Sequence, residues 1–153
     1  MKLFSLVVLI GLFASFSADI SDEPTGHPLK SEVALIADFG MRYHPVLKIR
    51  RMHAGVDFEV EEGTPVYATG DGTVHVAEEN TAYGKHIRIQ HADGFETVYA
   101  HLSEMNVTSG VDVKKGEQIG LTGNTGLSQG PHLHYEIRKD RKPLNPEDYL
   151  PKQ

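Results

Sequence analysis

Short hydrophobic runs separated by glycine and polar residues dominate the chain from Glu32 to its end. Valine, isoleucine, tyrosine and threonine fill these runs, and glycine, aspartate and asparagine separate them. The pattern is typical of β-strands joined by turns, and no segment has the repeat of a long amphipathic helix. It predicts strands over residues 56–60, 65–68, 72–78, 86–91, 96–101, 118–121 and 132–138.

The connections between these strands also carry signals. The Ala-Asp-Gly sequence at residues 92–94 predicts a hairpin turn. Residues 139–142 predict a polar turn, and residues 144–149 predict one short turn of helix near Pro146. Together these signals predict an all-β, mainly antiparallel fold, a compact β-sandwich or sheet with little helix.

Two stretches of the chain share a spacing of glycine and aliphatic residues. In residues 62–70 and 115–123, a glycine is followed by an aliphatic residue three positions later and by another glycine seven positions later. One interpretation is a pair of similar strand-and-turn units packed together, as in a small sandwich or barrel. The other is that strand-and-turn sequences often look alike by chance.

The first residues differ in character from the rest. One positive charge, an apolar run over residues 3–16 and small residues before Ala18 predict a secretory signal peptide over residues 1–18. The alternative is an uncleaved membrane anchor, although the run is short for a span of about 20 residues. The polar segment 19–31 predicts a flexible linker or arm, and residues 32–153 predict a single domain.

The composition narrows the class of protein. The chain of 153 residues contains no cysteine, which excludes disulfides and any thiolate metal site. Its formal net charge of −6, without a long basic run, argues against nucleic acid as a partner. A secreted chain without cysteine fits a bacterial envelope. We therefore expect a periplasmic or secreted protein, with no stable membrane association once the signal peptide is cleaved.

Five residues in three short segments stand out as candidate chemistry. His53 and Asp57 lie four positions apart, His101 stands in Tyr-Ala-His-Leu, and His132 and His134 flank a single leucine. Successive side chains of a strand point to opposite faces, so the last two histidines share one face. The residues between and after them, Leu133 and Tyr135, then point into a core.

These residue types match the ligands of zinc, which binds imidazole nitrogen and carboxylate oxygen. A catalytic zinc site uses three protein ligands and leaves one position open, whereas a structural site uses four. Because there are five candidates, a division into three ligands and two proton-handling histidines is chemically sensible. A metal that activates water beside two imidazoles can hydrolyse an unreactive bond such as an amide.

Several motifs, in the same order, resemble the lysostaphin/LytM-type zinc metallopeptidases that cut peptide bonds in bacterial peptidoglycan. The resemblance extends over residues 37–150. It rests on an Arg-x-His-Pro segment, His-x-x-x-Asp, Gly-Thr-Pro-Val-Tyr-Ala, Tyr-x-His-Leu, Gly-Asn-Thr-Gly and Gly-Pro-His-Leu-His-Tyr-Glu. Family members adopt a compact antiparallel β-fold with an open groove for an extended peptide, and the resemblance implies the same here.

The resemblance also implies roles for the five residues. His53, Asp57 and His134 would bind one Zn²⁺ ion, and His101 and His132 would be catalytic. The expected activity is a zinc-dependent endopeptidase that hydrolyses the stem-peptide cross-links of peptidoglycan. Periplasmic members from Gram-negative bacteria are the most similar, and they typically cleave D-Ala–diaminopimelate cross-links.

Other functions remain as alternatives. One is a non-hydrolytic module that binds peptidoglycan or activates a separate amidase. Another is a glycine-bridge endopeptidase of the lysostaphin branch. A regulatory or recruiting protein partner is left open, because nothing in the sequence identifies one.

Four further residues carry two interpretations each. Glu136 is expected to orient a metal ligand or to be exposed. Tyr99 is expected either to face the site with His101 and hydrogen-bond the transition state, or to line the groove. Arg42 would bind a substrate carboxylate or form a surface salt bridge, and His27 would be a fourth ligand or part of a disordered arm.

Overall fold

The protein is described by a computed structural model that covers residues 23–30, 33–44 and 47–151. Two 3-10 helices, η1 (Ala92–Gly94) and η2 (Pro146–Asp148), are the helical elements of this part of the chain. None of its helices is long and apolar enough to cross a membrane. Its strands are β1 (Leu35–Ala37), β2 (Gly40–Tyr43), β3 (Arg50–His53), β4 (Val56–Glu59), β5 (Pro65–Tyr67), β6 (Gly72–Asn80), β7 (Gly84–Gln90), β8 (Phe95–Met105), β9 (Asp112–Val113), β10 (Gln118–Thr122), β11 (His132–Lys139) and β12 (Lys142–Leu144).

The predicted all-β, mainly antiparallel fold with little helix is confirmed. Every strand expected from the hydrophobic pattern forms, with ends that differ by a few residues. The turns at 92–94 and 139–142 and the helical turn beside Pro146 also form. The strands not predicted from the sequence are short, and β3 is also largely exposed; they are β1, β2, β3, β9 and β12.

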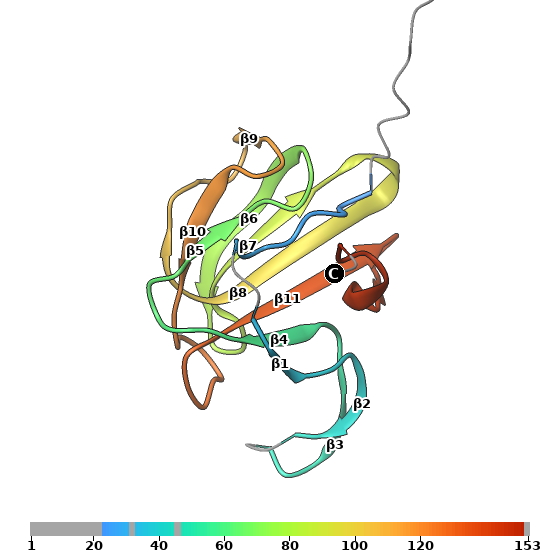
Figure 1. Ribbon diagram of the computed structural model, residues 1–153, viewed down its shortest axis with the longest axis vertical. Coiled ribbons are helices and arrows are strands. Elements are labelled where there is room, and N and C mark those ends of the chain that lie inside the picture. Colours follow the sequence, from blue (N-terminus) through green and yellow to red (C-terminus); the bar gives the residue numbers. More distant parts are fainter. Residues whose placement is uncertain (1–22, 31–32, 45–46, 152–153) are drawn as a thin grey trace, which may run out of the picture.

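One antiparallel sheet carries most of the strands, in the order β1-β4-β11-β8-β7-β6-β9. The far end of β8 also pairs with β10, which pairs with β5 (Figure 1). Strand β12 pairs with β11. Strands β5 and β10 belong to the two stretches of shared spacing, and they lie side by side. The two stretches therefore pack together, as the first interpretation of their shared spacing expects.

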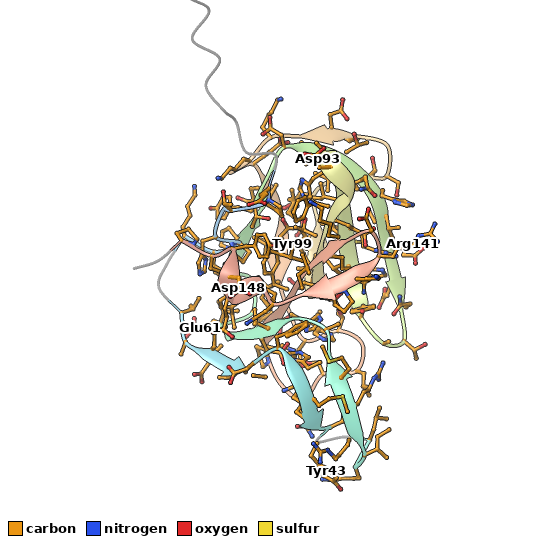
Figure 2. All side chains as sticks on the ribbon, turned by 90° about the vertical axis from the view of Figure 1, so that its right-hand side faces the viewer. Tyr43, Glu61, Asp93, Tyr99, Arg141 and Asp148 are labelled. Atoms are coloured by element: carbon orange, nitrogen blue, oxygen red, sulfur yellow. The ribbon has the colours of Figure 1, made fainter. Side chains whose placement is uncertain are left out.

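A separate two-stranded sheet, β2–β3, forms a hairpin at one end of the molecule. Figure 1 shows it projecting away from the main sheet, and Figure 2 shows Tyr43 near its far end. The main sheet thus supplies the rigid scaffold, and this hairpin extends beyond it.

The core lies on one face of the main sheet. Along β11, Leu133, Tyr135 and Ile137 are fully buried on that face, as the alternation predicts. Burial of each such side chain stabilises the fold by about 1.5–3 kcal/mol. Tyr99 and Tyr135 pack with ring centres 5.4 Å apart, and Figure 2 shows Tyr99 inside the molecule.

Residues 23–30 pack against the domain, so the predicted flexible linker over 19–31 is wrong for this part. Leu29 is almost fully buried in the core, and the Tyr67 amide donates a hydrogen bond to the Pro28 carbonyl. The ring of His27 contacts Phe58, whose side chain lies on the core side of β4, so His27 is not a fourth ligand. The apolar Leu29 within a polar segment explains the packing. The predicted signal peptide, residues 1–18, lies outside the described residues.

Candidate active site

Three of the five candidate residues meet on the polar face of the main sheet. Asp57 on β4 lies directly opposite His134 on β11, and His53 ends β3. Asp57 Oδ1 is 2.8 Å from His134 Nδ1 and 3.2 Å from His53 Nε2, and these two nitrogens are 3.1 Å apart. All three side chains are buried. We call His53, Asp57 and His134 the ligand cluster.

Neighbouring groups determine which nitrogen of each imidazole faces the centre of this cluster. His53 Nδ1 donates a hydrogen bond to the backbone oxygen of Asp38 at 2.7 Å, so its Nε2 turns inward. His134 Nε2 donates to Glu136 Oε1 at 2.9 Å, which leaves Nδ1 facing Asp57. An outer carbonyl or carboxylate of this kind is the usual support of a metal-binding histidine.

Two carboxylates beside His134 create a demand for positive charge. Burial lowers the pKa of His134, but hydrogen bonds with Asp57 and Glu136 outweigh burial and raise it to about 9. Burial also opposes ionisation of Asp57, yet hydrogen bonds with His134 and His53 hold its pKa well below the usual range. A proton on His134 balances this charge, and a bound cation can take the place of that proton. The donor set therefore fits a metal ion.

Glu136 is held in place from two sides, and it is almost fully buried rather than exposed. Tyr83 OH donates to Glu136 Oε1 at 2.7 Å, and Arg138 Nε and Nη2 each lie 2.6 Å from Oε2. Burial opposes ionisation of Glu136, but its contacts with His134 and Arg138 lower its pKa to about 2. The contacts of Tyr83 and Arg138 with Glu136 were not predicted. Arg138 lies two residues after Glu136 on the same strand, so alternation predicts that both share a face. The sequence around Tyr83 carries no comparable signal.

The other two candidate residues lie beside the ligand cluster, each with one nitrogen held by the backbone. His101 Nδ1 donates to the Thr125 carbonyl at 2.7 Å, and His132 Nδ1 donates to the Gly130 carbonyl at 2.8 Å. Their ring centres are 4.6 Å apart, and His132 Nε2 is 3.9 Å from Asp57 Oδ1. Burial lowers the pKa of His101 to about 4, so its imidazole is neutral at pH 7. Both Nε2 atoms are thus available to handle protons.

His101 owes its position to a β-bulge in β8. Ala100 and His101 together oppose the single residue His86 of β7, and the backbone of His101 has φ of 61°. Before the bulge β8 pairs with β11, and after it β8 pairs with β10. Bulges of this kind redirect side chains beside active sites.

Two glycines bring the loop between β10 and β11 to His101. Gly84 and Gly126 have φ of 62° and 73°. A Cβ atom on Gly84 would overlap Thr125, and one on Gly126 would overlap the backbone of Gly84. Because glycine tolerates both the positive φ and the close approach, the loop packs tightly and its Thr125 carbonyl reaches His101.

An open groove of about 460 Å³ passes over the ligand cluster and both remaining histidines, which confirms the expected groove. Its lining also includes Arg42 and Arg51 from the β2–β3 hairpin and Ser128 from the loop before β11. Arg42 Nη2 lies 3.0 Å from Asp57 Oδ2, so this arginine forms a salt bridge within the site.

Tyr99 does not belong to the site, and both roles expected for it are wrong. It is fully buried on the core face, where its hydroxyl lies 3.0 Å from the Thr69 amide nitrogen and 2.9 Å from Thr69 Oγ1. Regular alternation would place Tyr99 and His101 on one face of β8. The bulge at Ala100 and His101 breaks that alternation, which explains the difference.

The chain is similar to known peptidases. The Peptidase family M23 profile matches residues 51–146. The DD-carboxypeptidase/endopeptidase Mpg of Neisseria meningitidis is 47% identical over 108 residues, which are 71% of this chain and 25% of that protein. A crystal structure of a zinc-containing peptidase from Vibrio cholerae has a TM-score of 0.73 at 37% identity, covering 78% of this chain and 37% of that chain. The lysostaphin catalytic domain of Staphylococcus simulans has a TM-score of 0.69 at 32% identity, covering 76% of this chain and 91% of that chain.

The fold is that of a metallopeptidase domain, and the three residues of the ligand cluster lie close enough together to hold a metal ion. Because the match extends over more than half of its residues, the chain belongs to Peptidase family M23. The resemblance to lysostaphin/LytM-type enzymes is thereby confirmed. The chain spans about a quarter of the length of the curated relatives that it matches.

Proposed function

We propose that this protein is a zinc-dependent endopeptidase that hydrolyses peptide cross-links of bacterial peptidoglycan. The observation that carries the proposal is the convergence of His53, Asp57 and His134 beside two further imidazoles in an open groove. Family membership supports the proposal, as does the similarity to the DD-carboxypeptidase/endopeptidase of Neisseria. The substrate would be the stem peptides, and the place of action the periplasm or the outside of the cell, reached through the predicted signal peptide.

In this proposal His53, Asp57 and His134 hold one zinc ion, with Glu136 fixing the ring of His134 through its Nε2 hydrogen bond. When bound, zinc supplies Lewis-acid chemistry, because it polarises a carbonyl and lowers the pKa of water to about 7. Two imidazole nitrogens and one carboxylate would hold zinc as three protein ligands, the number that a catalytic zinc site uses when it keeps one position for water. The burial of all three ligands excludes bulk water from the side away from the groove.

His101 and His132 would move the protons. The neutral Nε2 of one imidazole accepts a proton from the attacking water, and an imidazolium then donates a proton to the leaving amine. A positively charged ring also stabilises the oxyanion that develops on the scissile carbonyl. The backbone carbonyls of Thr125 and Gly130 keep each Nδ1 protonated, which reserves Nε2 for this work.

The test is incubation of purified peptidoglycan with zinc-loaded protein, followed by mass spectrometry of the muropeptides. Loss of cross-linked dimers and gain of monomers is the expected result, and it should vanish with His132→Ala and with a chelator. The fragment masses would identify the bond and would separate a D-Ala–diaminopimelate activity from cleavage of glycine bridges. Intact dimers in the presence of zinc-bound protein would contradict the proposal and favour a binding or amidase-activating module.

A further inference from the structure

The β2–β3 hairpin concentrates positive charge in a protein that is acidic overall. Four of the 15 basic residues, but none of the 21 acidic ones, lie between Phe39 and Val56. They are Arg42, Lys48, Arg50 and Arg51. The hairpin projects from the main sheet (Figure 1). The hairpin therefore brings positive charge to one end of the groove, where Arg42 and Arg51 belong to the lining.

The two faces of this hairpin differ. Arg42 and Arg51 lie directly opposite each other, and both line the groove. Arg51 shares its face with His53, which is two residues further along β3. Arg50 points to the other face, opposite Tyr43, and it does not line the groove. One strand thus presents one arginine to the groove and another away from it.

Of the two opposed arginines, one has its charge neutralised by an ion pair and the other does not, within the described part of the chain. Like charges directly opposite in a sheet destabilise it. Arg42 is compensated by its ion pair with Asp57, whereas exposed Arg51 forms no ion pair with any residue in the described part of the chain. His44 also lines this end of the groove. Burial lowers the pKa of His44 most, and the positive charges of Arg51 and Arg42 lower it further. An anionic ligand would supply the missing charge.

We propose that Arg51 binds a carboxylate of the peptide substrate at this end of the groove. The inference rests on the proposed peptidase function and adds a substrate requirement to it. A guanidinium matches a carboxylate through two parallel hydrogen bonds. Arg51 lies about 7 Å from His53 along the strand, and an extended peptide advances about 3.3 Å per residue. For a peptide that runs along β3, this distance corresponds to a carboxylate about two residues from the scissile bond.

The experiment compares two cross-linked peptides that differ only in this carboxylate, which is free in one and amidated in the other. The zinc-loaded protein is assayed with Arg51→Gln and, as a matched control on the opposite face, Arg50→Gln. Arg51→Gln should raise KM for the free acid about two- to fivefold and leave kcat unchanged. It should not alter cleavage of the amide, and Arg50→Gln should resemble the wild type. Arg51→Lys should restore part of the lost affinity.

Equal effects of Arg51→Gln on both peptides, or no effect on either, would overturn the inference. Titration of each peptide into zinc-loaded His132→Ala protein, with and without Arg51→Gln, measures binding without turnover. If the wild type cleaves neither peptide, the proposed function fails, yet these titrations still decide the carboxylate site. Preference for the free acid that depends on Arg51 supports it, and equal affinities contradict it.

Discussion

The two faces of β11 carry different kinds of polar network. On the groove face, titratable groups follow one another along the strand at His132, His134, Glu136 and Arg138, and hydrogen bonds join the last three. On the core face, the hydroxyl of Tyr135 is the polar group, and it meets Thr69 Oγ1 at 2.8 Å. Alternate residues of one strand thus serve chemistry on one side and packing on the other.

The two networks differ in whether their polar groups find all their partners within the protein. The core network extends from Tyr135 through Thr69, Tyr99 and Thr97 to His91, and each hydroxyl has a partner within the protein. The groove network instead brings a carboxylate and two imidazoles together around a position that only a proton or a cation can occupy. Variants of the groove face should therefore change function, and variants of the core face should change stability.

His134→Ala should give the largest effect. Removal of one of three ligands should abolish stoichiometric zinc binding and cleavage of peptidoglycan, because two remaining ligands hold zinc too weakly. Zinc content by mass spectrometry of the purified protein and muropeptide analysis provide the measurements. A variant that retained one zinc per chain would contradict the assignment of the ligand cluster.

His132→Ala should separate metal binding from proton transfer on the same face of β11. We expect full zinc content and a decrease in kcat of about 10²–10⁴-fold, the usual contribution of a general acid or base. His101→Ala should behave similarly, since both rings keep Nε2 available. Loss of zinc from either variant would contradict the assignment of His101 and His132 to proton transfer alone.

Glu136→Gln should have an intermediate effect on the groove face. A neutral amide can still accept the hydrogen bond from His134 Nε2, but it removes the charge that supports this ligand. We expect zinc affinity to fall about 10–100-fold, measured by competition with a chromophoric chelator. Glu79→Gln, which changes an exposed carboxylate outside the site, is the control and should bind zinc like the wild type. Equal affinities in both variants would remove Glu136 from the metal site.

The regular strands were predictable from sequence, and so were the three residues of the ligand cluster. The two-residue alternation of β11 correctly placed His132 and His134 on one face and Leu133 and Tyr135 on the other. Such a prediction needs only a continuous strand, because each side chain then follows from its neighbour. The family resemblance supplied the roles that alternation cannot assign.

Irregular backbone and non-local contacts were not predictable in the same way. The bulge at His101 depends on β8 changing partners, so the alternation that worked for β11 misplaced Tyr99. Tyr83 reaches Glu136 from a turn 53 residues away, a contact without any local signal. The packing of Leu29 likewise depends on a core that forms from distant strands.

Tyr135→Phe, on the core face, should lower the stability of the protein without changing its function. The ring keeps its packing against Tyr99, but the hydrogen bond to Thr69 is lost. We expect the free energy of unfolding to fall by about 1 kcal/mol, with zinc content and kcat unchanged. Urea unfolding and the peptidoglycan assay measure the two quantities. A loss of activity without a loss of stability would mean that the two faces of β11 are not independent.

The smallest expected effect is on how the stability of the protein depends on pH, and it arises from His91 at the far end of the core network. His91 Nδ1 donates to the Asp71 carbonyl, its Nε2 meets Thr97 Oγ1, and the charge of Glu96 acts on it. Burial lowers the pKa of His91 below 6.5 despite the opposing effect of Asp71. The unfolded chain therefore binds a proton that the folded protein does not, and stability falls as the pH drops below about 6.5.

His91→Gln removes this proton uptake and should make stability less sensitive to acid. The measurement is the urea midpoint of both proteins at pH 7.5 and 5.5 in a chelator, so that the groove histidines contribute equally to each. We expect the variant to be less stable at pH 7.5, because it loses buried hydrogen bonds, but to lose less stability on acidification. An equal or larger loss in the variant would show that His91 takes up its proton in the folded state. The core network would then respond to acid without unfolding, and packing would no longer be its sole role.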